Sequence, residues 1–471
     1  MKLLTRSRIT RYMKNNQLNI IILAAGKGTR MHSIQPKVLH QIGGKSLLGH
    51  VLDCANSLNP SKIIVVYGYG GEKVQAALQQ ENLVWAEQKE QLGTGHAVQQ
   101  ALPYLDENSK TLILLGDVPL ISSAACNALL AQADSQLMIQ SFNKSNPTGY
   151  GRMVRNEQGL VHAIVEEKDT IAAQRDINEV NTGIMAMPTK QLKGWLNRLT
   201  NNNAQQEYYL TDIVGFAVED NIQVHADIAD DEWSVTGVNS KQDLALIERV
   251  YQQRQAEVLL KKGVTLFDPA RIDIRGRLET EKDVTVDVGC IFEGQVRLGE
   301  GVKIGAYCII KNATIAAGTT IAPFTHVDDA TIGENSKVGP YARLRPGTAL
   351  GGETHVGNFV ELKNAQVDTG SKINHLSYVG DATIGKKVNI GAGTITCNYD
   401  GANKFKTVIE DNVFVGSDSQ LVAPITIGKG ATIAAGSTIT KDTPADALTL
   451  CRAREQKSIL GWKRPVKAKK D

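Results

Sequence analysis

A short apolar run followed at once by glycines is the first stretch of this 471-residue sequence that suggests chemistry. Ile20–Leu23 is continuously aliphatic, as expected for a strand buried on both faces of a parallel sheet. Gly26 and Gly28 allow the backbone to turn sharply and to approach a ligand closely. Three cations surround this turn: Lys27, Arg30 and Lys37. The stretch suits a polyphosphate, and an ordinary strand-to-helix turn is the alternative at this point.

This glycine-rich loop matches neither of two common nucleotide-binding motifs. Met31 stands where a dinucleotide fingerprint has its third glycine, and the loop lacks the Gly-Lys-Ser/Thr ending of a P-loop. A second polar pair, Gly116 and Asp117, follows the aliphatic segment Thr111–Leu115. Because ligands bind at the carboxyl ends of parallel strands, the two loops together favour the phosphate interpretation.

Predicted strands and helices alternate from Asn19 to about Asn239. Besides the two segments above, the predicted elements are a strand at Lys62–Tyr67 and helical stretches near 47–58 and 94–104. Such alternation predicts an α/β domain with a mostly parallel sheet and helices on both faces. Between about Ser240 and Lys262 glycine and proline disappear, which predicts one long helix ended by Gly263. We interpret this helix as a solvated linker between two domains.

Aliphatic residues recur at every sixth position in the second half of the chain. The most regular series is Val415, Leu421, Ile427, Ile433 and Ile439. A period of six fits neither a helix nor an amphipathic strand, and is typical of a parallel β-helix built from hexapeptides. At about 18 residues per three-sided coil, the segment from about 283 to 439 holds about eight or nine coils.

Two segments do not follow this repeat. Cys397–Lys406 is polar and has no aliphatic residue in register, so we expect it to loop out and to act as a binding element. The tail from Arg452 to Lys470 is strongly basic. Solvated disorder and closure over a phosphorylated ligand are both compatible with that charge.

Composition excludes several classes of protein. The net charge of +3 gives no reason to invoke nucleic acid. The six cysteines lie far apart without a Cys-x-x-Cys pair, which argues against a zinc ribbon or a disulfide framework and suits a reducing cytoplasm. No apolar run approaches the ~18 residues of a membrane span. Residues 1–18 are predicted to be a disordered basic leader, and we expect Met13 to be the native start.

Longer motifs in both halves resemble known enzymes, and the resemblance extends from Asn19 to Val466. Leu23–Met31 with Lys37 is similar to the opening of sugar-nucleotide pyrophosphorylases. Two further motifs, Gln91–Ala97 and Asn201–Gln205, resemble the N-acetylglucosamine-1-phosphate branch of that group. His375–Tyr378 and Asn389–Gly401 resemble the acetyltransferase half of a bacterial bifunctional family.

The resemblance implies an architecture and two reactions. A Rossmann-like uridylyltransferase domain (19–239) would precede the linker helix (240–262) and a left-handed β-helix acetyltransferase domain (263–471). Acetyl-CoA would acetylate glucosamine-1-phosphate, and UTP would then react with the product to give pyrophosphate and UDP-N-acetylglucosamine, a cell-wall precursor. The family members are cytoplasmic homotrimers joined through the β-helix. The alternative is a single-activity nucleotidylyltransferase whose β-helix only trimerises.

The same resemblance implies the residues of a uridylyltransferase site. Arg30 and Lys37 would neutralise the phosphates, and Asp117 and Asn239 would hold Mg²⁺, an ion that prefers oxygen ligands. The nucleotide-binding positions would be Leu23, Ala24, Ala25, Gly26, Lys37, Gln88, Gly93, Thr94, Leu115 and Gly116. Those for the amino sugar would be Gly151, Glu166 and Asn181.

The acetyltransferase site implied by the resemblance centres on His375 as general base. Arg345 and Lys363 would bind the sugar phosphate, while Tyr378 and Asn389 would orient the sugar. The Ala392 N–H would polarise the thioester carbonyl. The other acetyl-CoA contacts would be Asn398, Tyr399, Ser417, Ala435 and Arg452. Covalent transfer through Cys397 is a rival mechanism, and the family pattern favours direct attack.

Overall fold

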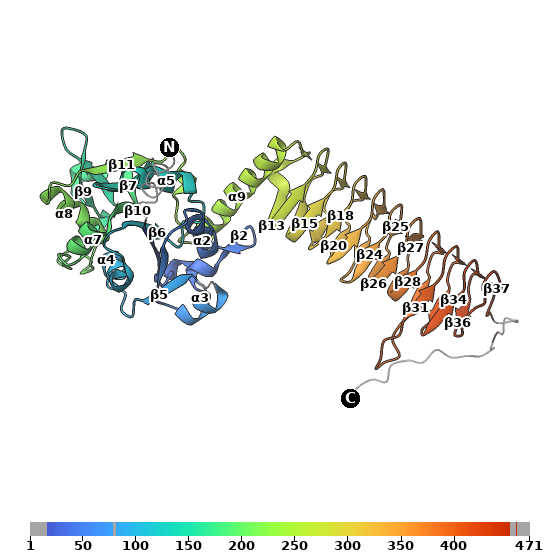
Figure 1. The fold of residues 1–471 in the computed structure, drawn as a ribbon. Coiled ribbons are helices and arrows are strands. Elements are labelled where there is room, and N and C mark those ends of the chain that lie inside the picture. Colours follow the sequence, from blue (N-terminus) through green and yellow to red (C-terminus); the bar gives the residue numbers. More distant parts are fainter. Residues whose placement is uncertain (1–16, 79–81, 453–457, 459–471) are drawn as a thin grey trace, which may run out of the picture. The chain divides into compact units, whose positions relative to one another are not determined.

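The computed structural model describes residues 17–78, 82–452 and 458. They form two compact units, Met1–Tyr251 and Gln252–Asp471, each described by itself (Figure 1). The proposed start at Met13 and the tail beyond Arg452, apart from residue 458, lie outside the described residues. In the part of the chain that is described, no helix is long and apolar enough to cross a membrane.

The first unit contains a sheet in the order β11-β7-β10-β6-β1-β4-β5, with a β8–β9 hairpin attached to β10. Strand β1 lies between β4 and β6 and is parallel to both. The strands are β1 (Leu18–Ala24), β4 (Lys62–Tyr67), β5 (Leu83–Glu87), β6 (Lys110–Leu115), β7 (Leu137–Asn143), β8 (Arg152–Arg155), β9 (Val161–Val165), β10 (Glu179–Pro188) and β11 (Val224–Ile228), with a separate pair β2 (Gln41–Ile42) and β3 (Lys45–Ser46). Strand β10 runs antiparallel to β6 and β7, so the sheet is mostly but not wholly parallel.

Helices cover both faces of this sheet, as predicted. Ile20 and Ile22 of β1 pack with helices α2 and α5, whereas Ile21 faces α4, α7 and α8. The helices are α2 (Leu47–Ser57), α3 (Gly71–Ala77), α4 (Thr94–Gln99), α5 (Ser123–Gln132), α6 (Ala172–Arg175), α7 (Thr189–Leu196) and α8 (Ile213–Glu219). Burial on both faces explains why β1 is aliphatic throughout rather than alternating.

Two boundaries differ from the sequence predictions. The predicted helix at 94–104 ends as α4 at Gln99, and a separate 3-10 turn follows at Leu102–Tyr104. Pro103 has no N–H to continue the helical ladder, which explains the break. Strand β1 begins at Leu18, one residue inside the predicted leader, because Leu18 pairs with Lys110.

Helix α9 (Lys241–Lys261) forms where the linker helix was predicted. Gly263 follows it with a φ of 86°, a left-handed conformation that glycine tolerates and that stops a helix. The first half of α9 belongs to the first unit, where Ile247 is buried. The second half belongs to the second unit, where Ala256 and Leu259 join the core of the coils.

The second unit is a parallel β-helix, which confirms the predicted class of fold (Figure 1). One sheet takes a single strand from each coil: β12 (Thr265–Leu266), β14 (Thr285–Val286), β16 (Lys303–Ile304), β19 (Thr320–Ile321), β22 (Lys337–Val338), β25 (His355–Asn358), β27 (Lys372–His375), β29 (Asn389–Ile390), β32 (Phe414–Val415), β35 (Thr432–Ile433) and β37 (Leu448–Thr449). Nine of these strands, β14 to β35, fall between residues 283 and 439, in agreement with the expected eight or nine coils. Strand β12 shows that the coils start earlier, near residue 265.

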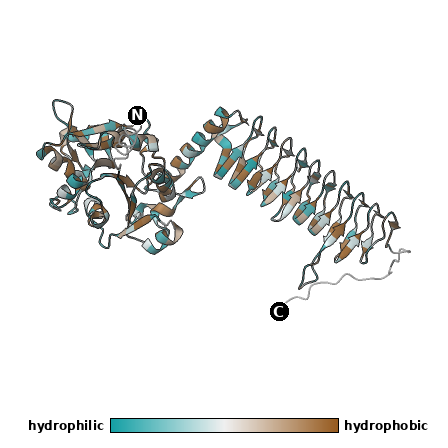
Figure 2. Ribbon diagram, in the orientation of Figure 1, coloured by the Kyte–Doolittle hydropathy of each residue, from teal (hydrophilic) through white to brown (hydrophobic). Residues whose placement is uncertain are grey.

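The remaining sides of the coils form a second large parallel sheet. Its strands are β13 (Ile272–Thr280), β15 (Cys290–Leu298), β17 (Ile309–Lys311), β18 (Thr314–Ile315), β20 (His326–Asp328), β21 (Ala330–Ile332), β23 (Arg343–Leu344), β24 (Thr348–Leu350), β26 (Glu361–Val367), β28 (Tyr378–Ile384), β30 (Ile395–Cys397), β31 (Thr407–Ile409), β33 (Gln420–Val422), β34 (Ile425–Ile427) and β36 (Thr438–Ile439). Hydrophobic residues recur in every coil (Figure 2). The hexad residues from Val415 to Ile439 are at most 4% exposed, so the six-residue period does mark the core.

Candidate functional sites

A cavity of about 320 Å³ opens where β1 and β6 end. Ten of the residues predicted to bind nucleotide or metal line it: Leu23, Ala24, Ala25, Gly26, Lys37, Gln88, Gly93, Thr94, Leu115 and Asp117. Val38, Gln91, Ala97 and Glu207 line it as well and were not predicted. The structure therefore brings together segments that are up to 184 residues apart at one edge of the sheet.

The two glycines after β1 have different roles. Gly28 has a φ of 58°, and a Cβ added there would lie 2.7 Å from Cβ of Lys37. Gly28 is therefore required by the turn and by the close approach of the Lys37 segment. A Cβ on Gly26 would meet nothing within 4 Å, so this glycine leaves open space beside the cavity. Within the described chain, the N–H groups of Ala25 and Gly26 have no hydrogen-bond partner and remain available to an anion.

Lys37 joins the two predicted metal ligands. Its Nζ forms an ion pair with the Asp117 carboxylate and lies 3.1 Å from Oδ1 of Asn239. The backbone holds the ligands together, because the N–H of Val238 donates to the Asp117 carbonyl at 2.8 Å. Two oxygens thus converge on one cation, and their chemistry fits Mg²⁺, which usually takes one or two protein oxygens beside phosphates and water. No cluster of three or more His, Cys, Asp or Glu side chains suited to a metal exists among the described residues.

Gln88 and Gly93 form the opposite wall of the cavity. Nε2 of Gln88 donates to the Gly93 carbonyl at 3.1 Å and to Nδ1 of His96 at 3.1 Å. Both donors of this amide are therefore used inside the protein, which leaves the amide oxygen as its acceptor for a ligand. Gly93 has a φ of 113°, and a Cβ there would lie 2.6 Å from the carbonyl oxygen of Tyr208. The glycines of the motif at 91–97 are explained by this contact with the 207–210 segment.

The three residues predicted for the amino sugar lie beside one another. The N–H of Asn181 donates to the Gly151 carbonyl at 2.9 Å. A Cβ on Gly151 would lie 3.4 Å from the Glu166 carboxylate. Burial raises the pKa of Glu166, and the charges of Asp212, Asp169 and Glu207 raise this pKa further. Thr211 donates to the Glu166 carboxylate at 3.0 Å, so the carboxyl group is held in a fixed orientation.

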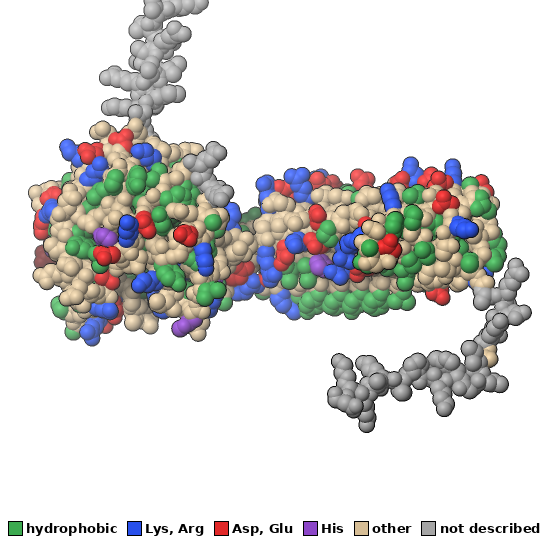
Figure 3. All heavy atoms as spheres, turned by 90° about the horizontal axis from the view of Figure 1, so that it is seen from below, with side chains coloured by type: hydrophobic (Ala, Val, Ile, Leu, Met, Phe, Trp, Pro, Cys, Tyr) green, Lys and Arg blue, Asp and Glu red, His purple; other side chains and the backbone are tan. Residues whose placement is uncertain are grey.

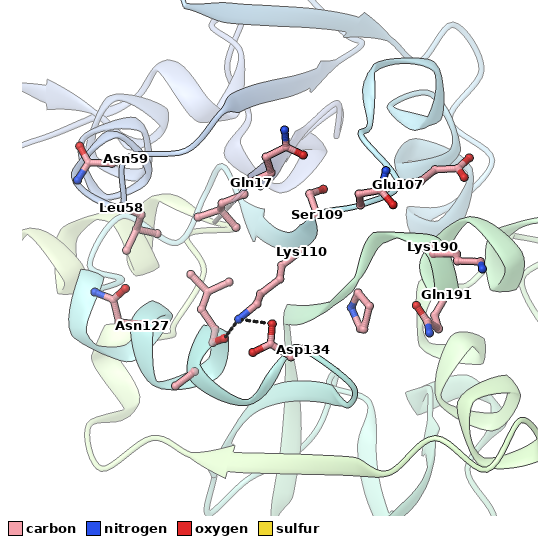
Figure 4. Close-up of a pocket in the computed structure, with 15 residues that line it drawn as sticks. Gln17, Leu58, Asn59, Glu107, Ser109, Lys110, Asn127, Asp134, Lys190 and Gln191 are labelled. Carbon is pink, nitrogen blue, oxygen red and sulfur yellow. Dashed lines mark hydrogen bonds and ion pairs between the residues drawn. The ribbon is translucent and has the colours of Figure 1, made fainter. Parts of the chain in front are cut away.

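Two predicted residues do not line the cavity. Arg30 is exposed at its margin, in the turn that follows Gly28. Gly116 lies behind the wall, where its N–H donates to the Leu23 carbonyl at 2.9 Å and fixes β6 against β1. A larger cavity, of about 630 Å³, lies at the opposite edge of the sheet, where β1 and β6 begin (Figure 4). It contains none of the predicted site residues; Lys110 pairs there with Asp134 at 2.9 Å.

In the second unit, one corner of successive coils carries the predicted acetyl-transfer residues. His375 and Ala392 are 17 residues apart, and Ala435 and Arg452 have the same spacing. Ser417 takes the equivalent place on the coil between them, because the polar loop adds residues to that coil. Neighbouring coils rise by about 4.8 Å, so this line from His375 to Arg452 spans about 19 Å.

The corner is also chemically suited to a thioester. The N–H of Ala392 has no hydrogen-bond partner in the described part of the chain, whereas its carbonyl accepts from Asp418 at 2.7 Å. Gly391 makes the close stacking possible, because a Cβ there would lie 2.5 Å from the Ser417 nitrogen. The exposed ring of His375 lies one coil before Ala392. Nδ1 of this ring lies 2.8 Å from Oδ1 of Asn358, on the preceding coil.

Three cations gather beside this corner. Arg345 and Lys363 occupy adjacent coils, as the pairing of β23 with β26 requires. Lys404 comes from the polar loop and was not predicted; its hydrogen bond and charge, with the charge of Arg345, lower the pKa of Lys363. Like charges held this close favour a dianionic ligand. Glu361 accepts from Arg345 at 2.7 Å and so orients the guanidinium.

The polar loop between β30 and β31 projects from the coils, as predicted (Figure 1). Its first residue, Asn398, is buried and donates to the Asp381 carboxylate. Hydrogen bonds from Asn364 and Asn398 lower the pKa of Asp381 despite its partial burial. Tyr399 is 60% exposed on the loop. Tyr378 packs over Gly380, where a Cβ would lie 2.4 Å from the phenol oxygen, while Asn389 is half-buried on β29.

Cys397 is poorly suited to nucleophilic catalysis. Burial raises the pKa of its thiol, and no charged neighbour acts in the opposite direction. The thiolate, not the thiol, is the nucleophile. This environment supports direct attack over the covalent alternative.

Several residues of these sites were missed by sequence reasoning. Asn358 precedes His375 by 17 residues, one coil, so the repeat period itself was a usable signal. Lys404 lies inside the loop that the sequence singled out. For Asp381, Gln91 and Glu207 the sequence offers no comparable signal, because their positions depend on turns far along the chain.

Fold and site together define a nucleotidyltransferase domain followed by a hexapeptide-repeat transferase domain. The model of the MobA-like NTP transferase domain matches residues 20–169, that of the GMPPB C-terminal domain residues 274–367, and that of the bacterial transferase hexapeptide residues 406–441. Among solved structures, a UDP-glucose pyrophosphorylase complexed with UDP-glucose covers 50% of this chain and 99% of its own, at 15% identity and a TM-score of 0.42.

Full-length relatives define the family more narrowly. The bifunctional protein GlmU of Methylobacillus flagellatus is 65% identical over 97% of this chain and 99% of its own length. Those of Janthinobacterium sp. and Chromobacterium violaceum are 57% and 55% identical, over 96% of this chain and 100% and 99% of their own lengths. The chain belongs to the bifunctional GlmU family.

Proposed function

We propose that this enzyme makes UDP-N-acetylglucosamine in two steps. The β-helix transfers acetyl from acetyl-CoA to glucosamine-1-phosphate, and the first unit then transfers uridylyl from UTP to N-acetylglucosamine-1-phosphate. The observation that carries the proposal is the arrangement of His375 beside three cations on the coils. A β-helix that only trimerises has no need for a hydrogen-bonded imidazole or for Arg345, Lys363 and Lys404 held close together.

Acetyl transfer requires a base, an oxyanion donor and charge neutralisation. Nε2 of His375 takes a proton from the attacking amine as the bond to the thioester carbon forms. The free N–H of Ala392 donates to the oxygen on which negative charge develops. Arg345, Lys363 and Lys404 bind the sugar phosphate. The thioester arm lies along the corner toward Ser417, Ala435 and Arg452, with its thioester end at His375.

Uridylyl transfer depends mainly on positioning and charge neutralisation. The N–H groups of Ala25 and Gly26 and the side chains of Lys37 and Arg30 bind the triphosphate. Asp117 and Asn239 hold Mg²⁺, which supplies further neutralisation of phosphate charge when bound. Gln88, Gly93 and Thr94 recognise the uracil, and Gly151, Glu166 and Asn181 hold the amino sugar against the cavity.

The proposal includes a homotrimer joined through the coils. A stripe of hydrophobic side chains runs along the second unit (Figure 3). Within it, Tyr307, Phe324, Tyr341 and Phe359 stack with ring centroids 5.4, 4.9 and 5.4 Å apart, although each ring is 47–57% exposed. Monomeric proteins rarely expose so large an apolar surface, so a second copy of the chain is its natural cover. Because UTP and acetyl-CoA are cytoplasmic metabolites, we place the enzyme in the cytoplasm.

Two variants test the division of labour. His375→Ala should lose CoA release from glucosamine-1-phosphate and acetyl-CoA, and should keep pyrophosphate release from N-acetylglucosamine-1-phosphate and UTP. Asp117→Ala should show the reverse. Thermal melting identifies variants that fail to fold. If both activities disappeared in a folded His375→Ala protein, or if its acetylation persisted, the proposed roles of the two units would be wrong.

A further inference from the structure

Asn358 contacts the His375 residue at two points. Oδ1 of Asn358 lies 2.8 Å from Nδ1 of the imidazole. The backbone carbonyl of Asn358 also accepts from the N–H of Leu376 at 3.1 Å. The side chain and the backbone of one residue therefore fix both the ring and the turn that carries it.

The coils keep Asn358 and His375 aligned. The two residues are paired in the register of β25 and β27. Gly357 lies so close to the next coil that a Cβ there would approach the Asn374 carbonyl to 2.0 Å. The His375 carbonyl is anchored as well, because it accepts from the Ser377 hydroxyl at 2.8 Å. Neither residue can shift without moving two coils.

The residue type at this corner is also informative. The residue before the left-handed corner position on other coils is small or cyclic: Ala306, Pro323, Pro340, Ala392, Ser417 and Ala435. Only small volume is thus needed for the turn itself. Asparagine at 358 adds a hydrogen-bonding group that the coil geometry does not require, and it does so one coil before the histidine.

We infer that Asn358 is a positioning residue that sets the tautomer of His375, an inference that rests on the proposed acetyl transfer. A side-chain amide oxygen only accepts hydrogen bonds, so Nδ1 of His375 carries the proton. The lone pair is then on Nε2, the nitrogen that receives the proton of the amine. Without Asn358 the imidazole divides between two tautomers and rotates more freely, and fewer molecules present a base to the substrate.

Three full-length variants test this role. Asn358→Ala should lower kcat for acetylation about 10- to 100-fold, a share of the effect of a well-placed general base, with little change in KM for glucosamine-1-phosphate. Asn358→Asp should restore most of kcat, because a carboxylate also only accepts from Nδ1. Gln295→Ala, which removes an exposed amide several coils away, is the matched control and should change neither constant. Uridylyl transfer should be unchanged in all three.

The ¹⁵N spectrum of labelled histidine gives a readout other than activity. His375→Ala assigns the signal, which should report protonated Nδ1 in the native protein and in Asn358→Asp, and a mixture in Asn358→Ala. Equal losses of kcat in the Ala and Asp variants, an unchanged kcat in Asn358→Ala, or a protonated Nε2 in the native protein would overturn the inference. Failure of the proposed function is distinguishable, because His375→Ala would then keep its acetylation.

Discussion

Gly26→Ala should separate ligand binding from folding at the nucleotide site. An alanine Cβ at this position meets nothing within 4 Å, and Gly26 is not left-handed. A glycine-to-alanine change at a compatible position stabilises a fold by about 0.4–1 kcal/mol through the unfolded chain. A bound triphosphate would, however, occupy the same space beside the free N–H groups. Overlap with one methyl group costs about 1–3 kcal/mol, which weakens binding about 5- to 150-fold.

Calorimetric titration with UTP and magnesium, together with thermal melting, measures both effects. Gly159→Ala is the matched control for backbone strain, because Gly159 has a φ of 79° and a Cβ there also meets nothing within 4 Å. That variant should lose some stability and bind UTP normally. Gly93→Ala should lose both, because its Cβ would lie 2.6 Å from the Tyr208 oxygen. Unchanged UTP affinity in a stable Gly26→Ala protein would refute the assignment of this space to the phosphates.

Four further predictions concern the metal, pH, core and thiol. EDTA should abolish pyrophosphate release and leave CoA release intact, since both proposed metal ligands lie in the first unit. Asp212→Asn should raise the melting temperature at pH 8 and not at pH 3: burial, with the charge of Asp169, raises the pKa of Asp212, so the native carboxylate becomes a cost only as the pH rises through that pKa. Leu421→Ala, at a fully buried hexad position, should cost about 2–5 kcal/mol in urea unfolding of the second unit. Cys397→Ala should retain acetylation in a CoA-release assay, and its loss with acetyl-CoA binding intact would revive the covalent mechanism.

Periodic features of this fold were predictable because burial imposes them on the sequence. The hexad from Val415 to Ile439 follows from a core that every coil must fill. The aliphatic run of β1 follows from burial on both faces of the sheet. The end of α4 was missed because the effect of Pro103 on the ladder was not weighed against the helical pattern around it.

Site geometry was less accessible, because it depends on contacts between distant residues. Lys37 lies 80 residues from Asp117 and 202 from Asn239, and no local pattern predicts that its ammonium joins their oxygens. The cation cluster likewise needs the conformation of the polar loop, which brings Lys404 to Lys363. Asn358 is different, since counting one coil back from His375 would have identified it.

One reaction tests the central claim, that each unit of this chain carries its own active site. The purified protein is incubated with glucosamine-1-phosphate, acetyl-CoA, UTP and magnesium, and CoA thiol and pyrophosphate are followed together. Both should appear, with thiol release preceding pyrophosphate release and UDP-N-acetylglucosamine as the final product. Pyrophosphate that appears only when N-acetylglucosamine-1-phosphate is supplied, with no thiol released, would contradict the account and leave the coils as a scaffold.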